Sequence, residues 1–251
     1  MAHPYLSIII PAYNEAERIP RTLVAIDKAL EHADFSYEIL VADNGSTDGT
    51  ADIVARMAHA VRNLRVVDGG TGGKGVAVRS GMRAADGVIR LFMDADNSTG
   101  IEQFADMIPR FKEGYDVVIG SRAVRGAKVD LSEPWPREYA GKALNMMAQI
   151  FLVPGLWDTQ CGFKAFTADA AERIFATAKA SGWAFDVEAL ALAKRFGYRI
   201  KEIPVRWVHD PRSRVRFTSG FHFMKELWDI RWRLWRGDYS WAGLDNRRGV
   251  R

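Results

Sequence analysis

The sequence has little cysteine and no long apolar run. Cys161 is the single cysteine among 251 residues, which excludes an internal disulfide framework and fits a reducing compartment. The longest apolar run near the middle of the chain, residues 150–157, is broken by Pro154 and Gly155 and is far shorter than the roughly 20 residues that span a bilayer. The first residues lack the basic start and full apolar core of a signal peptide. We therefore expect a cytoplasmic protein that is at most peripheral at the cytoplasmic face of a membrane.

A strong net charge is also lacking, but the charge of +4 is unevenly distributed. From Lys194 to the end, the chain carries 15 Lys and Arg residues against 6 Asp and Glu residues, and the part before Lys194 is net negative. A basic C-terminal part indicates an anionic partner. Nucleic acid, an anionic membrane and a phosphate-bearing substrate all fit this pattern.

Apolar, β-branched segments alternate with helical periodicity through the first half of the chain. Expected strands lie at residues 5–11, 37–43, 63–68, 87–93 and 115–122, and expected helices lie between them at 15–33, 46–58, 75–85 and 101–114. Strands separated by helices of this length indicate βαβ units. We therefore predict an α/β fold with a Rossmann-like, mostly parallel sheet flanked by helices.

The second half of the chain is less regular. A charged, proline-containing loop at 123–137 precedes an expected helix near 138–152, residues 183–197 enter a helix, and residues 198–208 alternate as one or two strands. No linker or internal repeat divides the chain. We predict one domain over residues 1–218, followed by a basic amphipathic helix and tail over 219–251.

Polar residues follow four of the expected strands. The segments AYNE, DNGS, DADNS and GSR each stand at the point where a strand ends. In parallel sheets, ligands bind beyond the carboxyl ends of the strands. The sequence therefore predicts a ligand site at this edge of the sheet.

Asp94 and Asp96 end the fourth strand and admit two interpretations. They could cap a helix that starts near Gly100, because side-chain oxygens there accept hydrogen bonds from free N–H groups. They could also hold Mg²⁺, which takes one or two carboxylates and completes its shell with water and substrate phosphates. Asp43 adds a third acid at the same edge. This context favours a metal site.

A glycine-rich segment follows the third strand. Gly70, Gly72 and Gly75 match the dinucleotide-binding pattern, with Asp94 about twenty residues further on. The match does not open the first βαβ unit, and the segment fails as a phosphate-binding P-loop because Gly75 replaces the required Ser or Thr. A loop that offers Lys74, with Arg79 further on, remains a candidate phosphate contact, and a surface turn is the alternative.

These segments together resemble a known family. The stretches SIIIPAYNEAERIPRTL, EILVADNGSTDGT, GKGVAVRSGM, LFMDAD and VVIGSR, in this order, resemble glycosyltransferase family 2, whose members have the GT-A fold. The later stretches DTQCGFKAF and WAFDVEALALAKRFGYRIKEIPVRW resemble the dolichyl- and polyprenyl-phosphate sugar synthases. The glucosyltransferase type is nearest and the mannose type is next. The resemblance covers about residues 5–208.

The resemblance implies a donor site. The residues expected to bind the nucleotide sugar are Pro11, Ala12, Tyr13, Glu15, Asp43, Asn44, Ser46, Lys74, Arg79, Asp94 and Asp186. Asp94 and Asp96 would hold Mg²⁺ or Mn²⁺ on the diphosphate and neutralise the leaving nucleotide. Family members often carry Gln two residues after the second aspartate, whereas this chain has Ser98. UDP-glucose is the favoured donor and GDP-mannose is the second candidate.

The acceptor is expected to be a polyprenyl phosphate. A phosphomonoester is mostly dianionic at neutral pH, since its second pKa is near ~6, so it needs cationic positioning more than a general base. The candidate phosphate contacts are Arg122, Arg137, Lys142, Lys164, Arg212 and Ser213. The candidate catalytic residues are Asp96, Arg122, Asp158 and Arg214. A basic run such as residues 209–216 can equally be a solvated face.

The basic segment 219–239 places Phe223, Leu227, Ile230 and Leu234 on one stripe, with tryptophans beside it. Such a helix can lie in a membrane interface, or it can dock on its own domain or on a second subunit of a homodimer.

The predicted function is inverting, metal-dependent transfer of a hexose, glucose before mannose, to polyprenyl phosphate, with no nucleic-acid partner. Transfer to a saccharide hydroxyl with Asp158 as base, an NAD-dependent oxidoreductase and a nucleic-acid- or membrane-binding module are the alternatives.

Overall fold

The computed structural model describes residues 3–130, 135–209 and 219–239, without the side chains of 135–140, 219 and 221. A central seven-stranded sheet has the strand order β3-β2-β1-β4-β7-β5-β8. Its strands are β1 (Leu6–Ala12), β2 (Tyr37–Asp43), β3 (Leu64–Asp68), β4 (Ile89–Met93), β5 (Val117–Ser121), β7 (Phe163–Thr167) and β8 (Ile200–Pro204). β7 runs antiparallel to both of its neighbours, and the other pairs are parallel. A second, two-stranded sheet pairs β6 (Lys128–Asp130) with β9 (Arg206–Val208).

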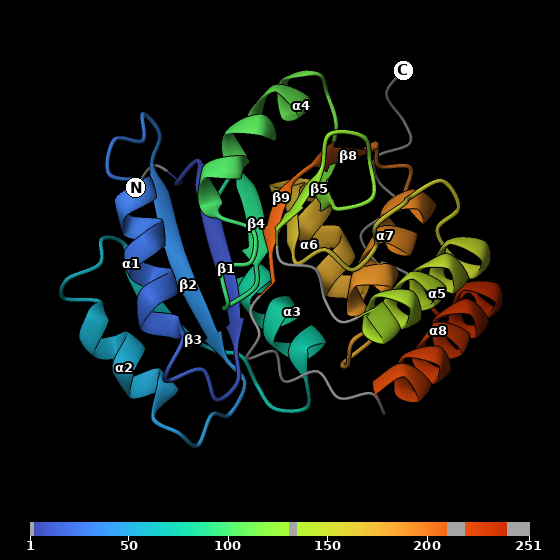
Figure 1. The fold of residues 1–251 in the computed structure, drawn as a ribbon, viewed down its shortest axis with the longest axis horizontal. Helices are drawn as coiled ribbons and strands as arrows, with labels where there is room; N and C mark the ends of the chain where they lie inside the picture. The colour runs from blue at the N-terminus through green and yellow to red at the C-terminus, as the bar shows by residue number, and fades with distance from the viewer. Residues whose placement is uncertain (1–2, 131–134, 210–218, 240–251) are drawn as a thin grey trace.

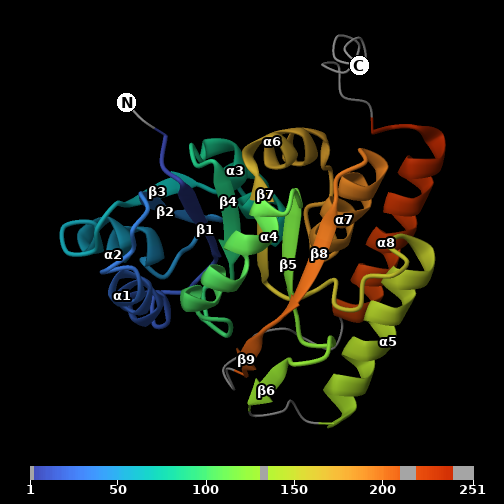
Figure 2. The same ribbon diagram turned by 90° about the horizontal axis from the view of Figure 1, so that it is seen from above.

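Helices cover both faces of the large sheet (Figures 1 and 2). They are α1 (Ile19–Ala29), α2 (Thr50–Met57), α3 (Lys74–Ala84), the 3₁₀ helix η1 (Ile101–Asp106), α4 (Ile108–Lys112), α5 (Trp135–Phe151), α6 (Ala168–Thr177), α7 (Phe185–Arg195) and α8 (Ser219–Arg236). One apolar cluster joins the sheet to α1, α2 and η1, and the other joins it to α3, α5, α6, α7 and α8.

The alternation of side chains along β1 explains the two clusters. All seven residues of β1 are buried, and Ile8 and Ile10 belong to one cluster whereas Ile9 belongs to the other. A strand buried on both faces must be apolar throughout. This requirement accounts for the run of isoleucines that made the strand predictable.

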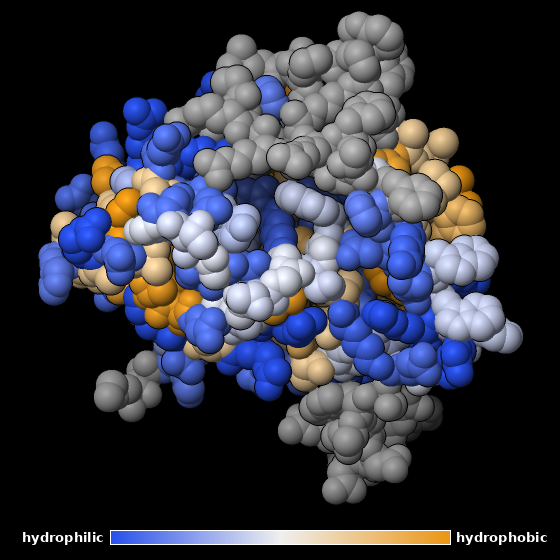
Figure 3. All heavy atoms as spheres, turned by 90° about the horizontal axis from the view of Figure 1, so that it is seen from below, coloured by the Kyte–Doolittle hydropathy of each residue, from blue (hydrophilic) through white to orange (hydrophobic). Residues whose placement is uncertain are grey.

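The parallel strands β1 and β2 end together at one edge of the sheet. Ala12 pairs with Asp43, and Asp43 pairs with Asp68 at the end of β3. Figure 1 shows the arrowheads of β1 and β2 at the lower edge, and Figure 3 looks onto this edge. The surface there is mainly hydrophilic around a recess (Figure 3). The polar segments that follow the strands are therefore gathered at one place.

Three expectations about secondary structure need correction. The strand β7 was not expected, and the segment 101–114 is divided into η1 and α4 instead of forming one helix. The expected loop 123–137 contains β6 and the start of α5. The apolar stripe of the C-terminal helix, for which a membrane interface, a second subunit and its own domain were the alternatives, packs on its own domain: Phe223, Leu227 and Ile230 are buried in the core, and Leu234 packs against it. Within the described residues, no helix has the length and apolar character that a membrane crossing requires.

The close contact of α3 with β1 generates a prediction. A Cβ at Gly81 would lie 2.4 Å from Cγ2 of Ile9, so Gly81→Ala should destabilise the protein by about 1–3 kcal/mol through overpacking. In the matched control Gly141→Ala on α5, the new Cβ meets no described atom within 4 Å, and the change should be stabilising by about 0.5–1 kcal/mol. Urea unfolding measures both variants. Equal effects of the two substitutions would contradict this account of the packing.

Candidate active site

Asp94 and Asp96 lie in the turn that follows β4, at the carboxyl edge of the sheet. Asp96 accepts a hydrogen bond from the backbone N–H of Ser98 at 3.0 Å. Gly100, which precedes η1, has no side-chain cap, so the two aspartates do not cap this helix. Burial and then the charge of Asp94 raise the pKa of Asp96. The turn thus holds two carboxylates whose mutual repulsion favours a bound cation.

The glycine at position 162 gives Asp94 its room. The backbone N–H of Asp94 donates to the carbonyl of Gly162 at 3.1 Å, and a Cβ at Gly162 would lie 2.0 Å from the Asp94 carboxylate. No third Asp, Glu, His or Cys within the described ranges completes a cluster of metal ligands. Two carboxylates without further protein ligands match the way Mg²⁺ is held together with substrate phosphates.

Lys74 pairs with the first of the two aspartates. Its Nζ lies 2.5 Å from Oδ1 of Asp94. Burial opposes the ammonium charge, but Asp94, Asp186 and Asp96 outweigh burial and raise the pKa of Lys74. Lys74 is therefore a firmly charged cation at the carboxyl edge of the sheet.

The glycine-rich segment is packed against the chain before α7. A Cβ at Gly73 would lie 2.5 Å from the carbonyl oxygen of Ser181, and the N–H of Gly75 donates to the same oxygen at 2.9 Å. In addition, β3 and β4 are separated in the sheet by β2 and β1. In a dinucleotide-binding unit these two strands would be neighbours, so the glycine pattern carries Lys74 and does not form a dinucleotide fingerprint.

A buried ion pair stands behind Lys74. Nζ of Lys164 lies 2.6 Å from Oδ1 of Asp186 and also donates to the carbonyl of Cys161. Lys164 has no exposed surface, and burial raises the pKa of Asp186. The prediction that Lys164 contacts the acceptor phosphate directly does not fit this placement, because its ammonium is enclosed and paired with Asp186.

The end of β2 carries an unpartnered carboxylate oxygen. Oδ2 of Asp43 accepts from the N–H of Ser46 at 3.1 Å, whereas Oδ1 is buried without a hydrogen-bond partner. A pocket of about 530 Å³ adjoins it, lined by Asp43, Gly45, Ala51, Val66, Val67, Asp68, Gly70 and Thr71. An isolated buried acceptor of this kind is costly, and a ligand N–H would satisfy it.

The neighbouring residues organise this pocket. Asn44 donates to the carbonyls of Gly69 and Gly70 at 3.2 and 3.1 Å and accepts from the N–H of Gly73 at 3.0 Å. Ser46 accepts from the N–H of Asn14. Both predicted binding residues therefore fix the loops after β1, β2 and β3 relative to one another.

The remaining donor residues lie at the end of β1. Pro11 and Ala12 are buried in the strand, and the side chain of Tyr13 is 58% exposed. Glu15 forms an ion pair with Arg18 at 2.5 Å. Tyr13 is thus the member of this group whose surface is open to a ligand.

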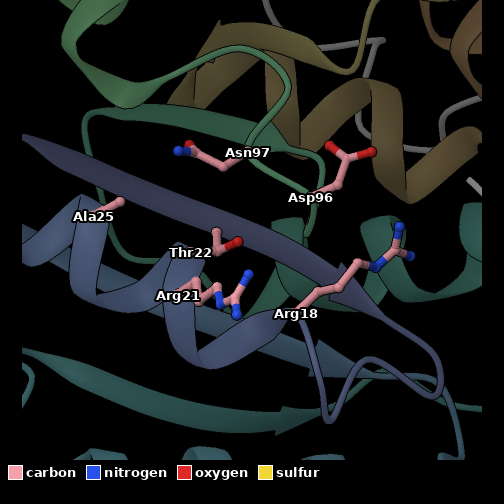
Figure 4. A pocket seen from close by; sticks show the side chains of 6 residues that line it. All are labelled: Arg18, Arg21, Thr22, Ala25, Asp96 and Asn97. Carbon is pink, nitrogen blue, oxygen red and sulfur yellow. The ribbon is translucent and has the colours of Figure 1, made fainter. Parts of the chain in front are cut away.

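A second pocket of about 290 Å³ opens beside Asp96. Figure 4 shows Arg21, Thr22 and Ala25 of α1, and Arg18 just before it, on one side of this pocket, with Asp96 and Asn97 on the other. Thr22 donates to the carbonyl of Ala95 at 2.6 Å, which ties α1 to the turn. No sequence motif singles out these arginines; the helical spacing 18, 21, 22, 25 is the signal that places them on one face.

Arg122 and Asp158 form a bidentate pair after β5. Nε and Nη2 of Arg122 lie 2.8 and 3.0 Å from the two carboxylate oxygens, and the backbone N–H groups of Arg122, Gln160 and Cys161 also donate to Asp158. Although burial opposes it, Arg122 lowers the pKa of Asp158. Burial raises the pKa of Cys161 to about 12, so this thiol is no nucleophile.

Other predicted residues are placed elsewhere. Arg79 donates to the carbonyl of Ala178 at 3.3 Å, and Lys142 is exposed on α5. The side chain of Arg137, together with Arg212, Ser213 and Arg214, lies outside the described residues.

The family follows from a match over most of the chain. Residues 7–175 match the family model described as glycosyl transferase family 2. The chain belongs to glycosyl transferase family 2. The family prediction is confirmed, and so is the class of enzyme.

Curated relatives extend the match beyond these residues. The dolichyl-phosphate beta-glucosyltransferase of Dictyostelium discoideum is 34% identical over 249 residues, which cover 93% of this chain and 76% of the relative. The human protein of the same name is 32% identical over 256 residues, which cover 92% of this chain and 76% of the human protein. This family 2 chain is thus similar to the glucosyltransferase type over nearly its full length.

Solved structures share the fold. Mannosyl-3-phosphoglycerate synthase from Rubrobacter xylanophilus has a TM-score of 0.68 at 19% identity, covering 95% of this chain and 77% of its own. Glucosyl-3-phosphoglycerate synthase from Mycobacterium tuberculosis in complex with UDP has a TM-score of 0.66 at 20% identity, covering 96% and 82%. The GT-A fold prediction for this family 2 enzyme is confirmed.

Proposed function

We propose that this family 2 enzyme transfers glucose from UDP-glucose to a dolichyl or other polyprenyl phosphate, with inversion at the sugar carbon and with a divalent metal. The proposal is carried by the cluster of Asp94, Asp96 and Lys74 at the carboxyl edge of the sheet. The relatives named as dolichyl-phosphate beta-glucosyltransferases support glucose and the lipid phosphate.

The nucleotide base would lie in the pocket at the end of β2. The unpartnered Oδ1 of Asp43 supplies an acceptor for a base N–H, and a pyrimidine such as uracil carries one. The exposed ring of Tyr13 and the fixed loops around Asn44 would border the same space. A fold neighbour solved with UDP supports this choice of nucleotide.

The donor set at Asp94 and Asp96 fits Mg²⁺ or Mn²⁺, and a fold neighbour was solved with Mn²⁺ and UDP. A bound divalent ion would neutralise charge on the diphosphate as it leaves. Lys74 adds a second cation for the same diphosphate, and the Lys164–Asp186 pair lies next to it. Asp186, whose carboxylate is paired and buried, orients these cations.

On the acceptor side, Arg122 is a cation that follows β5 within the described residues. Asp158 holds its guanidinium on one side, and the ring of Trp207 lies 5.3 Å from Cζ. The phosphate dianion would attack the anomeric carbon as the bond to the diphosphate breaks, so no base is required. Asp158 is unsuited as a base for a hydroxyl acceptor, because its pKa is lowered and an efficient base has a pKa near the working pH.

The aromatic face of α8 supports peripheral membrane contact. Trp228, Trp232 and Trp235 are 64%, 47% and 74% exposed and recur at helical spacing. Lys225, Arg231 and Arg236 are exposed on the same helix, and α8 lies beside α5 at one end of the molecule (Figures 1 and 2). Tryptophan and basic residues together favour the interface of an anionic bilayer. That two copies of the chain form a homodimer stays a prediction.

Asp96→Ala tests the metal and donor site. We expect glucosyl transfer to fall by about 10³-fold, because charge stabilisation of the leaving group is lost. UDP-glucose with Mn²⁺ should stabilise the wild type by about 2.7 kcal/mol at 100 times its dissociation constant, and this shift should disappear in the variant. Asp106→Ala, at an exposed acid of η1, is the control. Undiminished transfer by Asp96→Ala would refute the assignment, and stabilisation by NAD alone would favour the oxidoreductase.

Arg122→Ala tests the acceptor site. We expect KM for polyprenyl phosphate to rise by about tenfold or more, since a charge-assisted contact to phosphate contributes roughly 1.5–3 kcal/mol, whereas KM for UDP-glucose should change little. Arg62→Ala removes an arginine paired with Asp27 before β3 and should leave both constants unchanged. Steady-state kinetics with each substrate varied in turn measures them. An unchanged acceptor KM for Arg122→Ala would exclude this role.

Replacing the three tryptophans tests the membrane contact. The variant Trp228→Ser/Trp232→Ser/Trp235→Ser should bind vesicles of phosphatidylcholine and phosphatidylglycerol at least about tenfold more weakly, which corresponds to roughly 1.4 kcal/mol. Val24→Ser/Val88→Ser removes exposed apolar side chains far from α8 and should bind as the wild type does. Co-sedimentation measures the partitioning. If the triple variant binds vesicles normally, α8 is not the contact.

A further inference from the structure

Glu226 of α8 reaches the chain segment that precedes α7. Its Oε1 accepts the N–H of Gly182 and its Oε2 accepts the N–H of Ala184, each at 2.9 Å. A Cβ at Gly182 would lie 2.1 Å from Oε1, so the approach requires glycine at this position. A carboxylate that satisfies two backbone donors with two different oxygens fixes the segment between them.

The residue between these two donors is Trp183. Its ring centroid lies 5.7 Å from Nζ of Lys74, as does the ring centroid of Phe185. The side chain of Trp183 is 42% exposed, whereas Phe185 is buried. Trp183 thus presents open aromatic surface beside the cation that pairs with Asp94.

The rest of the segment is held from the other side. Oε2 of the fully buried Glu188 accepts the N–H groups of Lys179 and Ala180 at 2.9 and 2.7 Å, and the carbonyl of Ser181 accepts from Gly75. Both ends of the segment are therefore fixed. Trp183 is therefore exposed although the segment that carries it is held in place. An ordered, exposed indole beside an active site is a suitable surface for a ligand.

We propose that Trp183 contacts the hexose ring of the nucleotide sugar and that Glu226 is the positioning residue that holds it there. The inference rests on the proposed function. With the diphosphate at Lys74, the attached sugar lies within reach of the adjacent indole, whose flat face complements the C–H face of a hexose. Both residues lie beyond residues 7–175, which the family model matches.

The role of Glu226 follows from the helix that Trp183 precedes. Ala184 is the N-cap of α7 and provides no side-chain cap of its own, so α7 takes its capping acceptor from α8. Capping acceptors stabilise one conformation of the residues that enter a helix. Glu226→Gln keeps the size of the side chain but replaces one accepting oxygen with an amide donor, which cannot accept from the second N–H.

The test compares binding of UDP-glucose with binding of UDP, both with Mn²⁺, by isothermal titration calorimetry. Trp183→Ala should weaken UDP-glucose by about tenfold and leave UDP within about twofold, because the indole contacts only the sugar. Trp183→Phe should retain part of the difference in affinity between UDP-glucose and UDP. Glu226→Gln should also weaken the binding of UDP-glucose relative to that of UDP, so that the ratio of the two dissociation constants rises. Asp229→Asn, nearly one turn further along α8, should leave this ratio as it is in the wild type.

The outcomes are separable. If the wild type binds neither UDP-glucose nor UDP, the proposed function fails. If the wild type binds both and Trp183→Ala weakens them equally or not at all, the contact with the sugar is wrong. If Trp183→Ala changes the ratio of the dissociation constants of UDP-glucose and UDP but Glu226→Gln does not, Glu226 does not position Trp183. In steady-state kinetics, Trp183→Ala should raise KM for UDP-glucose and not for polyprenyl phosphate; the reverse would overturn the assignment.

Discussion

The balance of charge at the end of β4 is the constraint on which the rest of the site depends. Two carboxylates in one turn repel each other, and burial makes that repulsion stronger. Lys74 offsets part of it at 2.5 Å from Asp94, and the enclosed pair of Lys164 and Asp186 extends the alternation of charges into the core. The surrounding backbone is arranged to permit this approach: Gly162 leaves room for Asp94, and Gly73 and Gly75 let Lys74 enter over the segment before α7.

The sequence was sufficient for the parts of the molecule that obey local rules. The β-branched runs and helical periodicities predicted β1 to β5 and the helices α1 to α3, and the polar residues after the strands predicted the edge that carries the site. Asp94 and Asp96 were favoured as a metal site because they end a buried strand at the same edge as Asp43 and the other polar segments. The resemblance to a family added the diphosphate that this metal would bind.

What sequence reasoning missed depends on contacts between distant segments. β7 pairs with β4 and β5, which are distant from it in the sequence, so no local pattern predicts this strand. Lys164 is a candidate phosphate contact from the sequence because β7 is not predictable there, and it is the alternation of side chains within β7 that turns Lys164 inward towards Asp186. The stripe of α8 was ambiguous because an amphipathic helix looks the same whether a core or a lipid covers it; the packing of Phe223 and Leu227 decided it. Glu226 had no motif at all.

The insertion of β7 between β4 and β5 also affects how the chain folds. Met93 pairs with Phe163 about 70 residues later, and closing such a loop costs entropy before its contacts are made. Until then, the strands β1 to β4 can assemble from near neighbours, while β4 keeps an unpaired edge of the kind that promotes association between chains. The nucleotide half of the site therefore lies in the early, local part of the sheet, and the half that carries Arg122 and Asp158 is completed by the last strands to arrive.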